Sequence, residues 1–200
     1  MMARRHDLVG LTVLAMLSVR ASHPYELHRF IVDTHKDYVT GLPRSLYHAV
    51  DRLAKDELIT PAETGREGRR PERTVYEITD EGRQELTVRM RRLLEQPEPD
   101  RRTFVAAVSM IGVLAPEAAL KALRTRTAAL QGSIGGIDAH LATLAENGLP
   151  EMLMLELECD RALYGAELDW VRTVIGRIER GELDWSGTVK QSLMEQLLDE

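Results

Sequence analysis

Four arginines stand close together in residues 65–79, which read GREGRRPERTVYEIT. Glycine and proline favour a tight turn, and a planar guanidinium can donate two parallel hydrogen bonds to one phosphate. The arginines are Arg66, Arg69, Arg70 and Arg73. This pattern predicts a basic loop that contacts a nucleic-acid backbone. The alternative is a solvated loop of mixed charge, because Glu63, Glu67 and Glu72 dilute the arginines.

A second donor-rich stretch lies just before this loop, at residues 43–55. Its apolar residues recur at helical spacing and form one inward stripe: Leu46, Ala49, Val50 and Leu53. The opposite face carries mainly donors, with Asp51 as the only acid: Arg44, Ser45, His48, Arg52 and Lys55. Arginine can bond guanine bidentately, and serine and histidine can bond base edges or phosphate. We expect this face to read DNA.

Two tyrosines admit both a packing role and a binding role. We expect Tyr47 to pack mainly, with its hydroxyl at the rim of the core or on a phosphate, and we count it among the DNA-binding candidates. Tyr25 is similar, and for it we expect a place in the core.

The elements before and after this stretch must position it. Periodicity predicts a helix over residues 7–19 and a second helix capped by Ser22 with Pro24 in its first turn. Two β-prone runs, 58–60 and 74–79, flank the Arg-rich turn and predict a hairpin, and a fourth helix follows Thr79. Three helices followed by a basic hairpin are typical of a winged helix-turn-helix, whose third helix enters the major groove.

The sequence QPEPD at residues 96–100 is the best domain boundary in the chain. We therefore expect a winged helix-turn-helix domain over residues 1–96 and an all-helical domain over residues 97–200. The fold class is mainly α with a small β-hairpin wing. The second domain should begin with one amphipathic helix that carries Phe104, Val105, Val108, Ile111 and Leu114, and end with a helix over about 151–180.

Between these two helices, apolar residues alternate spacings of three and four for about seven turns. This seam consists of Leu120, Leu123, Leu130, Ile134, Ile137, Leu141 and Leu144, with Thr127 as its one polar member. A single winged helix makes too few base contacts for promoter affinity, so we expect the seam to join two copies of the chain. The alternative is a helical hairpin within one monomer.

Charge separates the two halves. Residues 1–96 hold 16 Lys and Arg against 15 Asp and Glu, whereas residues 97–200 hold 10 against 17. The acidic second half should not touch DNA. There, Met152 and Trp170 are candidates for an effector pocket, although such residues are more often ordinary core.

The sequence gives little support for an enzyme. The six histidines show no metal-ligand spacing, and Cys159 lies among acids, which disfavours a thiolate. We expect no enzyme, no metal and no cofactor. One cysteine fits a reducing cytoplasm, and the apolar run after Arg4 and Arg5 lacks a cleavage site and is too short to span a bilayer.

Several short motifs together resemble the PadR family of bacterial transcriptional regulators over roughly residues 8–90. They are Tyr25-Glu26-Leu27, Ser45-Leu46-Tyr47, Leu53, Leu58-Ile59, Arg73 with Tyr76, and Thr79 with Gly82. The helical remainder resembles the longer-tailed, AphA-like branch. The resemblance implies a dimeric repressor or activator that acts on promoter DNA.

This chain departs from the family pattern at Pro24, Arg44 and His48, where glycine or proline is common. Because these changes fall on the reading face, the target sequence cannot be transferred from a relative. The rival interpretation is a winged helix that binds another protein and not DNA.

Overall fold

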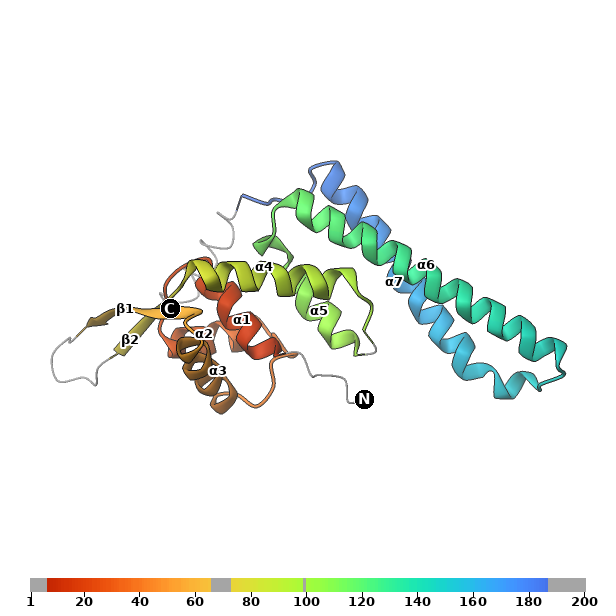
Figure 1. The fold of residues 1–200 in the computed structure, drawn as a ribbon, viewed down its shortest axis with the longest axis horizontal. Helices are drawn as coiled ribbons and strands as arrows, with labels where there is room; N and C mark the ends of the chain where they lie inside the picture. The colour runs from red at the N-terminus through yellow and green to blue at the C-terminus, as the bar shows by residue number, and fades with distance from the viewer. Residues whose placement is uncertain (1–6, 66–72, 99, 187–200) are drawn as a thin grey trace. The chain divides into compact units, whose positions relative to one another are not determined.

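The computed structural model describes residues 7–65, 73–98 and 100–186, and Figure 1 shows its helices and its one hairpin. The helices are α1 (Leu8–Leu17), α2 (Pro24–Asp33), α3 (Arg44–Lys55), α4 (Asp80–Glu95), α5 (Arg101–Ser109), α6 (Pro116–Glu146) and α7 (Leu155–Glu179). Two short 3-10 turns, η1 (Ile111–Val113) and η2 (Glu151–Leu153), precede α6 and α7. Strands β1 (Ile59–Gly65) and β2 (Arg73–Ile78) form the hairpin. The described part is therefore mainly α with a two-stranded wing, as the sequence predicted.

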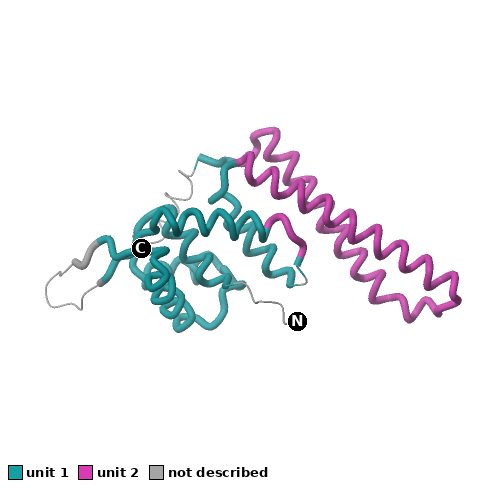
Figure 2. The backbone as a smooth tube through the Cα atoms, viewed as in Figure 1, with its two compact units in different colours: residues 1–93, 98–115, 184–200 teal, residues 94–97, 116–183 magenta. Residues whose placement is uncertain are grey.

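The chain forms two compact units, coloured separately in Figure 2. Unit 1 contains residues 1–93, 98–115 and 184–200, and unit 2 contains residues 94–97 and 116–183. Residues 98–115 thus group with the N-terminal elements in space. The expected domain division into residues 1–96 and 97–200 stays a prediction.

Helix α1 is the centre of unit 1 and packs against α3 and β2. It is apolar all round, and every residue from Gly10 to Leu17 is buried. Such a helix has no face for water, so it must be enclosed by other elements. The inward stripe of α3 is buried as predicted, with Leu46, Ala49, Val50 and Leu53 all in the core.

The start of α2 differs from the prediction, because His23 and not Ser22 caps the helix. The Nδ1 atom of His23 accepts the backbone N–H of Tyr25 at 3.0 Å, and the Glu26 carboxylate accepts the N–H of His23 at 2.7 Å. Ser22 is instead fully buried in an antiparallel bridge with Tyr76, closed by two backbone hydrogen bonds of 3.0 Å. Because the backbone N–H and carbonyl of Ser22 bond to Tyr76 of β2, the N-cap of α2 is the next residue, His23.

The hairpin that follows α3 is antiparallel and irregular. Ile59 pairs with Ile78 at its base and Gly65 with Arg73 at its far end, and the register shifts between Pro61 and Glu63. A bulge of this kind bends a strand and increases its twist.

A tight junction holds the base of this wing. The Leu58 N–H donates to the Leu53 carbonyl at 2.9 Å, and the Leu58 carbonyl accepts the N–H of Thr79 at 3.1 Å. The Thr79 hydroxyl caps α4 by accepting the N–H of Gly82 at 3.0 Å, and it donates to the Glu57 carbonyl at 2.9 Å. The end of α3, the base of the hairpin and the start of α4 are therefore tied through backbone groups.

The segment after α4 does not form the single amphipathic helix that the sequence predicted. Phe104, Val105, Val108, Ile111 and Leu114 do not lie on one helix, because α5 ends at Ser109 and Ile111 opens a 3-10 turn. Val105 is 58% exposed, so it does not belong to the buried face.

Unit 2 is built on α6 and α7, which lie side by side as a hairpin (Figure 1). Helix α6 starts at Pro116 as expected, whereas α7 starts at Leu155 and not near residue 151, because Glu151–Leu153 form a 3-10 turn. Gly181 follows the last helix with a φ of +67°. The side chain of Arg126 is buried between α6 and α7 and 1% exposed. Its Nε donates to Glu167 at 2.6 Å and its Nη1 to the carbonyls of Gln96 and Leu94 at 2.8 and 3.5 Å.

Within the described ranges, none of the helices has the length and apolar character needed to cross a membrane.

We predict that Gly82→Ala destabilises unit 1. The added Cβ would lie 2.1 Å from the Leu58 carbonyl oxygen and 2.8 Å from Cγ1 of Ile78, and the oxygen is backbone that cannot rotate away. Overpacking of this kind typically costs about 1–3 kcal/mol. Urea unfolding followed by circular dichroism should show the loss.

Gly132→Ala in α6 is the matched control, because nothing lies within 4 Å of its added Cβ. This change should be neutral or stabilise the helix by about 0.5–1 kcal/mol. Equal effects of the two substitutions would contradict the junction described above.

Candidate nucleic-acid interface

The outward face of α3 carries most of the side chains predicted to read DNA. Arg44, Tyr47, His48, Arg52 and Lys55 are all exposed, whereas the four apolar positions of the opposite stripe are buried. The helix thus has one face buried in the core and an opposite, exposed face rich in hydrogen-bond donors. Its last turn also carries Arg52 and Lys55, which complement the negative end of the helix dipole.

Ser45 is the member of the predicted set that is already engaged. It is half-buried, and its hydroxyl donates to the Thr40 carbonyl at 2.8 Å. A hydroxyl has one proton, so in this state Ser45 can accept a hydrogen bond but cannot donate one to phosphate. Its contact holds the turn before α3.

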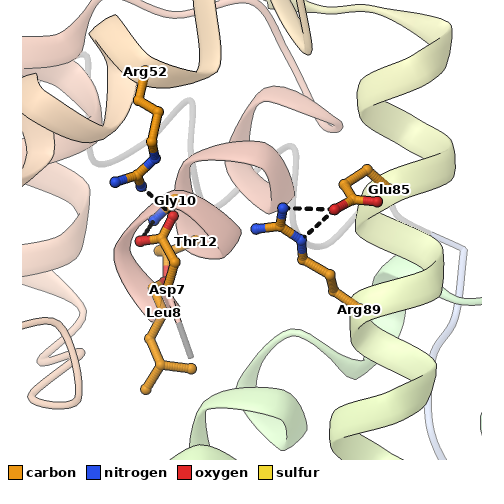
Figure 3. A network of polar contacts seen from close by, with 7 residues as sticks. All are labelled: Asp7, Leu8, Gly10, Thr12, Arg52, Glu85 and Arg89. Atoms are coloured by element: carbon orange, nitrogen blue, oxygen red, sulfur yellow. Dashed lines mark hydrogen bonds and ion pairs between the residues drawn. The ribbon is translucent and has the colours of Figure 1, made fainter. Parts of the chain in front are cut away.

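Arg52 is paired within the protein. Figure 3 shows its guanidinium directed at the carboxylate of Asp7, where the two side chains form an ion pair. The same carboxylate caps α1, because its other oxygen accepts the N–H of Gly10 at 3.0 Å. The Arg52 side chain remains 51% exposed, so this pair lies at the surface and competes with any phosphate that approaches.

A second pair in the same view lies on α4, where Arg89 contacts Glu85 one turn earlier at 2.6 Å (Figure 3). Arg83, near the start of α4, donates to the Ser18 carbonyl at 3.2 Å. Both arginines therefore have partners inside unit 1.

The two tyrosines are more exposed than the sequence suggested. Tyr25 is 59% exposed, so the expectation that it lies in the core is wrong. It follows Pro24 in the first turn of α2, where its side chain is exposed although Pro24 and Leu27 are buried. Tyr47 is 44% exposed, which fits the expected mixed role. A sequence pattern shows a tyrosine's spacing but not how much of its ring is covered.

The wing is described only in part. Arg66, Arg69 and Arg70 lie outside the described residues, and Arg73 opens β2 opposite Gly65. Their proposed contacts with phosphate stay a prediction from the sequence.

The residues of the predicted seam on α6 differ in how far they are buried. Leu123 and Leu130 are buried, whereas Leu120, Ile134, Ile137, Leu141 and Leu144 are half-buried. Large apolar side chains are also exposed on the η2 and α7 side: Met152, Leu153, Leu155, Leu163 and Trp170. Met152, at 76%, and Trp170, at 44%, are among them, and their role in an effector pocket stays a prediction.

The described residues contain no group of three or more histidine, cysteine, aspartate or glutamate side chains placed to hold a metal ion. Cys159 is exposed on α7.

Comparison with known proteins gives one family match. Residues 13–88 match the model of the transcriptional regulator PadR-like family. The search among curated proteins gave no significant match.

Several solved structures are similar at low identity. The structure of Bacillus subtilis PadR in complex with operator DNA is 17% identical, with a TM-score of 0.41, and the match covers 84% of this chain and 98% of that one. A PadR-like transcriptional regulator from Bacillus cereus is 16% identical, with a TM-score of 0.38 and coverage of 86% and 99%. The structure of Bacillus subtilis PadR with p-coumaric acid is 15% identical, with a TM-score of 0.39 and coverage of 86% and 99%.

We predict that Asp7→Asn strengthens DNA binding. Asparagine caps a helix about as well as aspartate, so α1 should keep its start, while Arg52 loses its competing carboxylate. A surface ion pair is worth up to about 1 kcal/mol, so affinity for duplex DNA should rise by a factor of about two to five at low salt. Fluorescence anisotropy with a labelled duplex measures it.

Arg52→Ala is the companion variant and should weaken binding. If Asp7→Asn left the affinity unchanged while Arg52→Ala lowered it, Arg52 would reach DNA without leaving Asp7.

Proposed function

Residues 13–88 are a PadR-like domain, and from this premise we propose that the chain is a sequence-specific DNA-binding transcriptional regulator that acts as a dimeric repressor. The observation that carries the proposal is the outward face of α3, which presents exposed arginine, histidine and lysine on a helix whose other side is fixed in the core. In a winged helix-turn-helix this is the helix that enters the major groove.

The exposed donor residues of α3 and their neighbours have different chemical roles in this proposal. Arg44 and His48 stand in the first half of the helix and contact base edges, where arginine bonds guanine O6 and N7. Arg52 and Lys55, in the last turn, neutralise phosphates. Ser45 supports the turn before the helix, since its hydroxyl is committed to Thr40. Tyr47 and Tyr25 supply exposed hydroxyls that bond the DNA backbone.

The wing binds the phosphate backbone beside that groove. Arg66, Arg69, Arg70 and Arg73 supply the charge, and the hairpin starts directly after α3 through the Leu58 junction. These contacts add affinity but no sequence information, because every base pair has the same phosphates.

Dimerisation is the second part of the proposal. The exposed apolar side chains of η2 and α7, with the half-buried seam of α6, are the residues that we expect a second copy to cover. A two-fold dimer places two reading helices on successive major grooves, about 34 Å apart. A bound dimer on a promoter would exclude polymerase, which is the simplest route to repression.

We further propose a cytoplasmic protein whose second half responds to a small molecule. Met152 and Trp170 are the candidate wall residues from the sequence. The rival function is a protein-binding winged helix, and DNA binding itself discriminates between the two.

Binding to a duplex should depend steeply on salt. If each subunit neutralises about four phosphates, the slope of log K against log salt should be roughly −7 for the dimer. Anisotropy titrations between 50 and 300 mM salt, with a selected genomic fragment as the duplex, measure the slope. A protein-binding module would give no measurable affinity for any duplex in the series.

Substitutions on α3 and substitutions in the wing should change DNA binding in different ways. Arg44→Ala or His48→Ala should cost about 1–3 kcal/mol on the best site and little on others, because each removes a base contact. The double change Arg69→Ala and Arg70→Ala should weaken all sequences alike and reduce the magnitude of the dimer's salt slope by about 3.6, because it removes two phosphate contacts from each subunit. Selection from random duplexes with each variant separates these outcomes. A wing variant with unchanged affinity would remove the wing from the interface.

Leu163→Glu should dissociate the dimer without unfolding the chain. Leu163 is 39% exposed on α7, so a single chain tolerates a charge there, whereas a covered interface does not. Sedimentation velocity should show a shift from dimer to monomer. Gln131→Glu, which adds the same charge at an exposed polar position of α6, should leave the dimer intact.

A further inference from the structure

The α6–α7 hairpin is an insertion within unit 1, because the chain leaves unit 1 after Ala115 and returns to it at Asp184. The two connections of the hairpin lie at its same end (Figure 2). A contact between these connections therefore closes the hairpin at its base. Trp185 makes such a contact, since its indole N–H donates to the Leu114 carbonyl at 2.7 Å.

The chain between α7 and Trp185 is ordered by its own hydrogen bonds. The N–H of Gly181 donates to the Ile178 carbonyl at 3.0 Å. The N–H of Glu182 donates to the Arg177 carbonyl at the same distance. With the φ of +67° at Gly181, these two bonds form a Schellman motif, a common way for a helix to end on glycine. The direction of the chain after α7 is therefore fixed.

A second turn places the indole. The Asp184 carboxylate accepts the N–H of Ser186 at 2.8 Å, which is the spacing of an Asx turn, and Trp185 lies between these two residues. Trp185 is half-buried, and Leu114 is 3% exposed. An indole can donate a hydrogen bond but cannot accept one, so a half-buried tryptophan needs an acceptor. The Leu114 carbonyl supplies it.

This contact costs little to form and is held by little. Its partners are 71 residues apart in sequence. Because α6 and α7 pair as a hairpin, Pro116 and Glu179 already lie at the same end, and closure orders only residues 180–185. The gain is one hydrogen bond and one partly covered ring, and a hydrogen bond of this kind shifts a population by about two- to tenfold. Segments held by so few contacts open locally.

We propose that residues 181–186 form a latch with two states. In the closed state the Trp185 indole lies on the Leu114 carbonyl and joins the two connections of the hairpin. In the open state residues 181–186 are released, while unit 1 and the α6–α7 hairpin stay folded. The latch requires neither DNA nor a second copy, so it goes beyond the proposed function.

The indole N–H of Trp185 is a direct probe of the latch. Trp185→Phe removes its NMR signal and so distinguishes it from the signal of Trp170. In the full natural chain, hydrogen exchange of the Trp185 indole should be about tenfold or more slower than exchange of free indole.

A matched pair of variants tests the turn that places the indole. Asp184→Ala removes the acceptor of the Asx turn, so exchange of the Trp185 indole should become about two- to tenfold faster. Asp184→Asn is the control, because its side-chain carbonyl can accept the same N–H, and exchange should match that of the natural chain.

Gly82→Ala separates release of the latch from unfolding of unit 1. This change destabilises unit 1, so the amides of α1 should exchange faster. The Trp185 indole should keep its natural rate, because local release does not pass through unfolding of unit 1.

Trp185→Phe tests the link to the end of α7. Phenylalanine keeps an aromatic ring but cannot donate, so the latch should open more often. The amides of Gly181 and Glu182 should then exchange about two- to tenfold faster. The amides of the buried Leu123 and Leu130 should be unchanged, and circular dichroism verifies that the variant is folded.

Four results would overturn the proposal. They are exchange of the Trp185 indole as fast as that of free indole, equal rates in Asp184→Ala and Asp184→Asn, indole exchange that rises in step with α1 in Gly82→Ala, and unchanged amides of Gly181 and Glu182 in Trp185→Phe. Because none of these measurements contains DNA or depends on a second copy, failure of the latch leaves the proposed function open. Loss of DNA binding likewise leaves the latch open.

Discussion

The relative placement of α3, the wing and α4 depends on the carbonyl group of Leu58. Its oxygen accepts the N–H of Thr79 and lies 2.1 Å from where a side chain on Gly82 would begin. Backbone hydrogen bonds therefore link the end of α3, the base of the hairpin and the first turn of α4. Because backbone groups have little freedom to adjust, the reading helix and the wing cannot change their mutual placement without breaking this junction. Two surfaces that we propose to contact one duplex need that kind of constraint.

Polar contacts within unit 1 decide which side chains of the outward face of α3 are available to bind a ligand. The Asp7 carboxylate caps α1 and also holds Arg52, so one charge serves both helix stability and the availability of a guanidinium. Ser45 likewise stabilises the turn before α3, because its hydroxyl donates its one proton to the Thr40 carbonyl and has none left for a ligand. A binding face assembled from such residues keeps a defined geometry before any ligand arrives, which lowers the conformational entropy lost on binding.

The end of α4 belongs to unit 2, together with α6 and α7. Arg126 covers the carbonyls of Leu94 and Gln96, where the helix has no N–H groups of its own left to bond them, and Glu167 balances the charge. A buried guanidinium is tolerated only when it is paired and hydrogen-bonded, and here the Glu167 carboxylate and the carbonyls of Leu94 and Gln96 accept its hydrogen bonds.

Local sequence determined the helices, the hairpin and the two-faced character of α3, because apolar spacing and turn residues act over a few positions along the chain. It could not place Ser22 against Tyr76, expose Tyr25, break the segment after Ser109, or bury Arg126, since each depends on a partner distant in sequence. The same holds for the site: the donors of α3 were visible in the sequence, but the engagement of Arg52 by Asp7 and of Ser45 by Thr40 was not. Periodicity reports which side of an element avoids water, and only tertiary packing decides which polar groups find one another there.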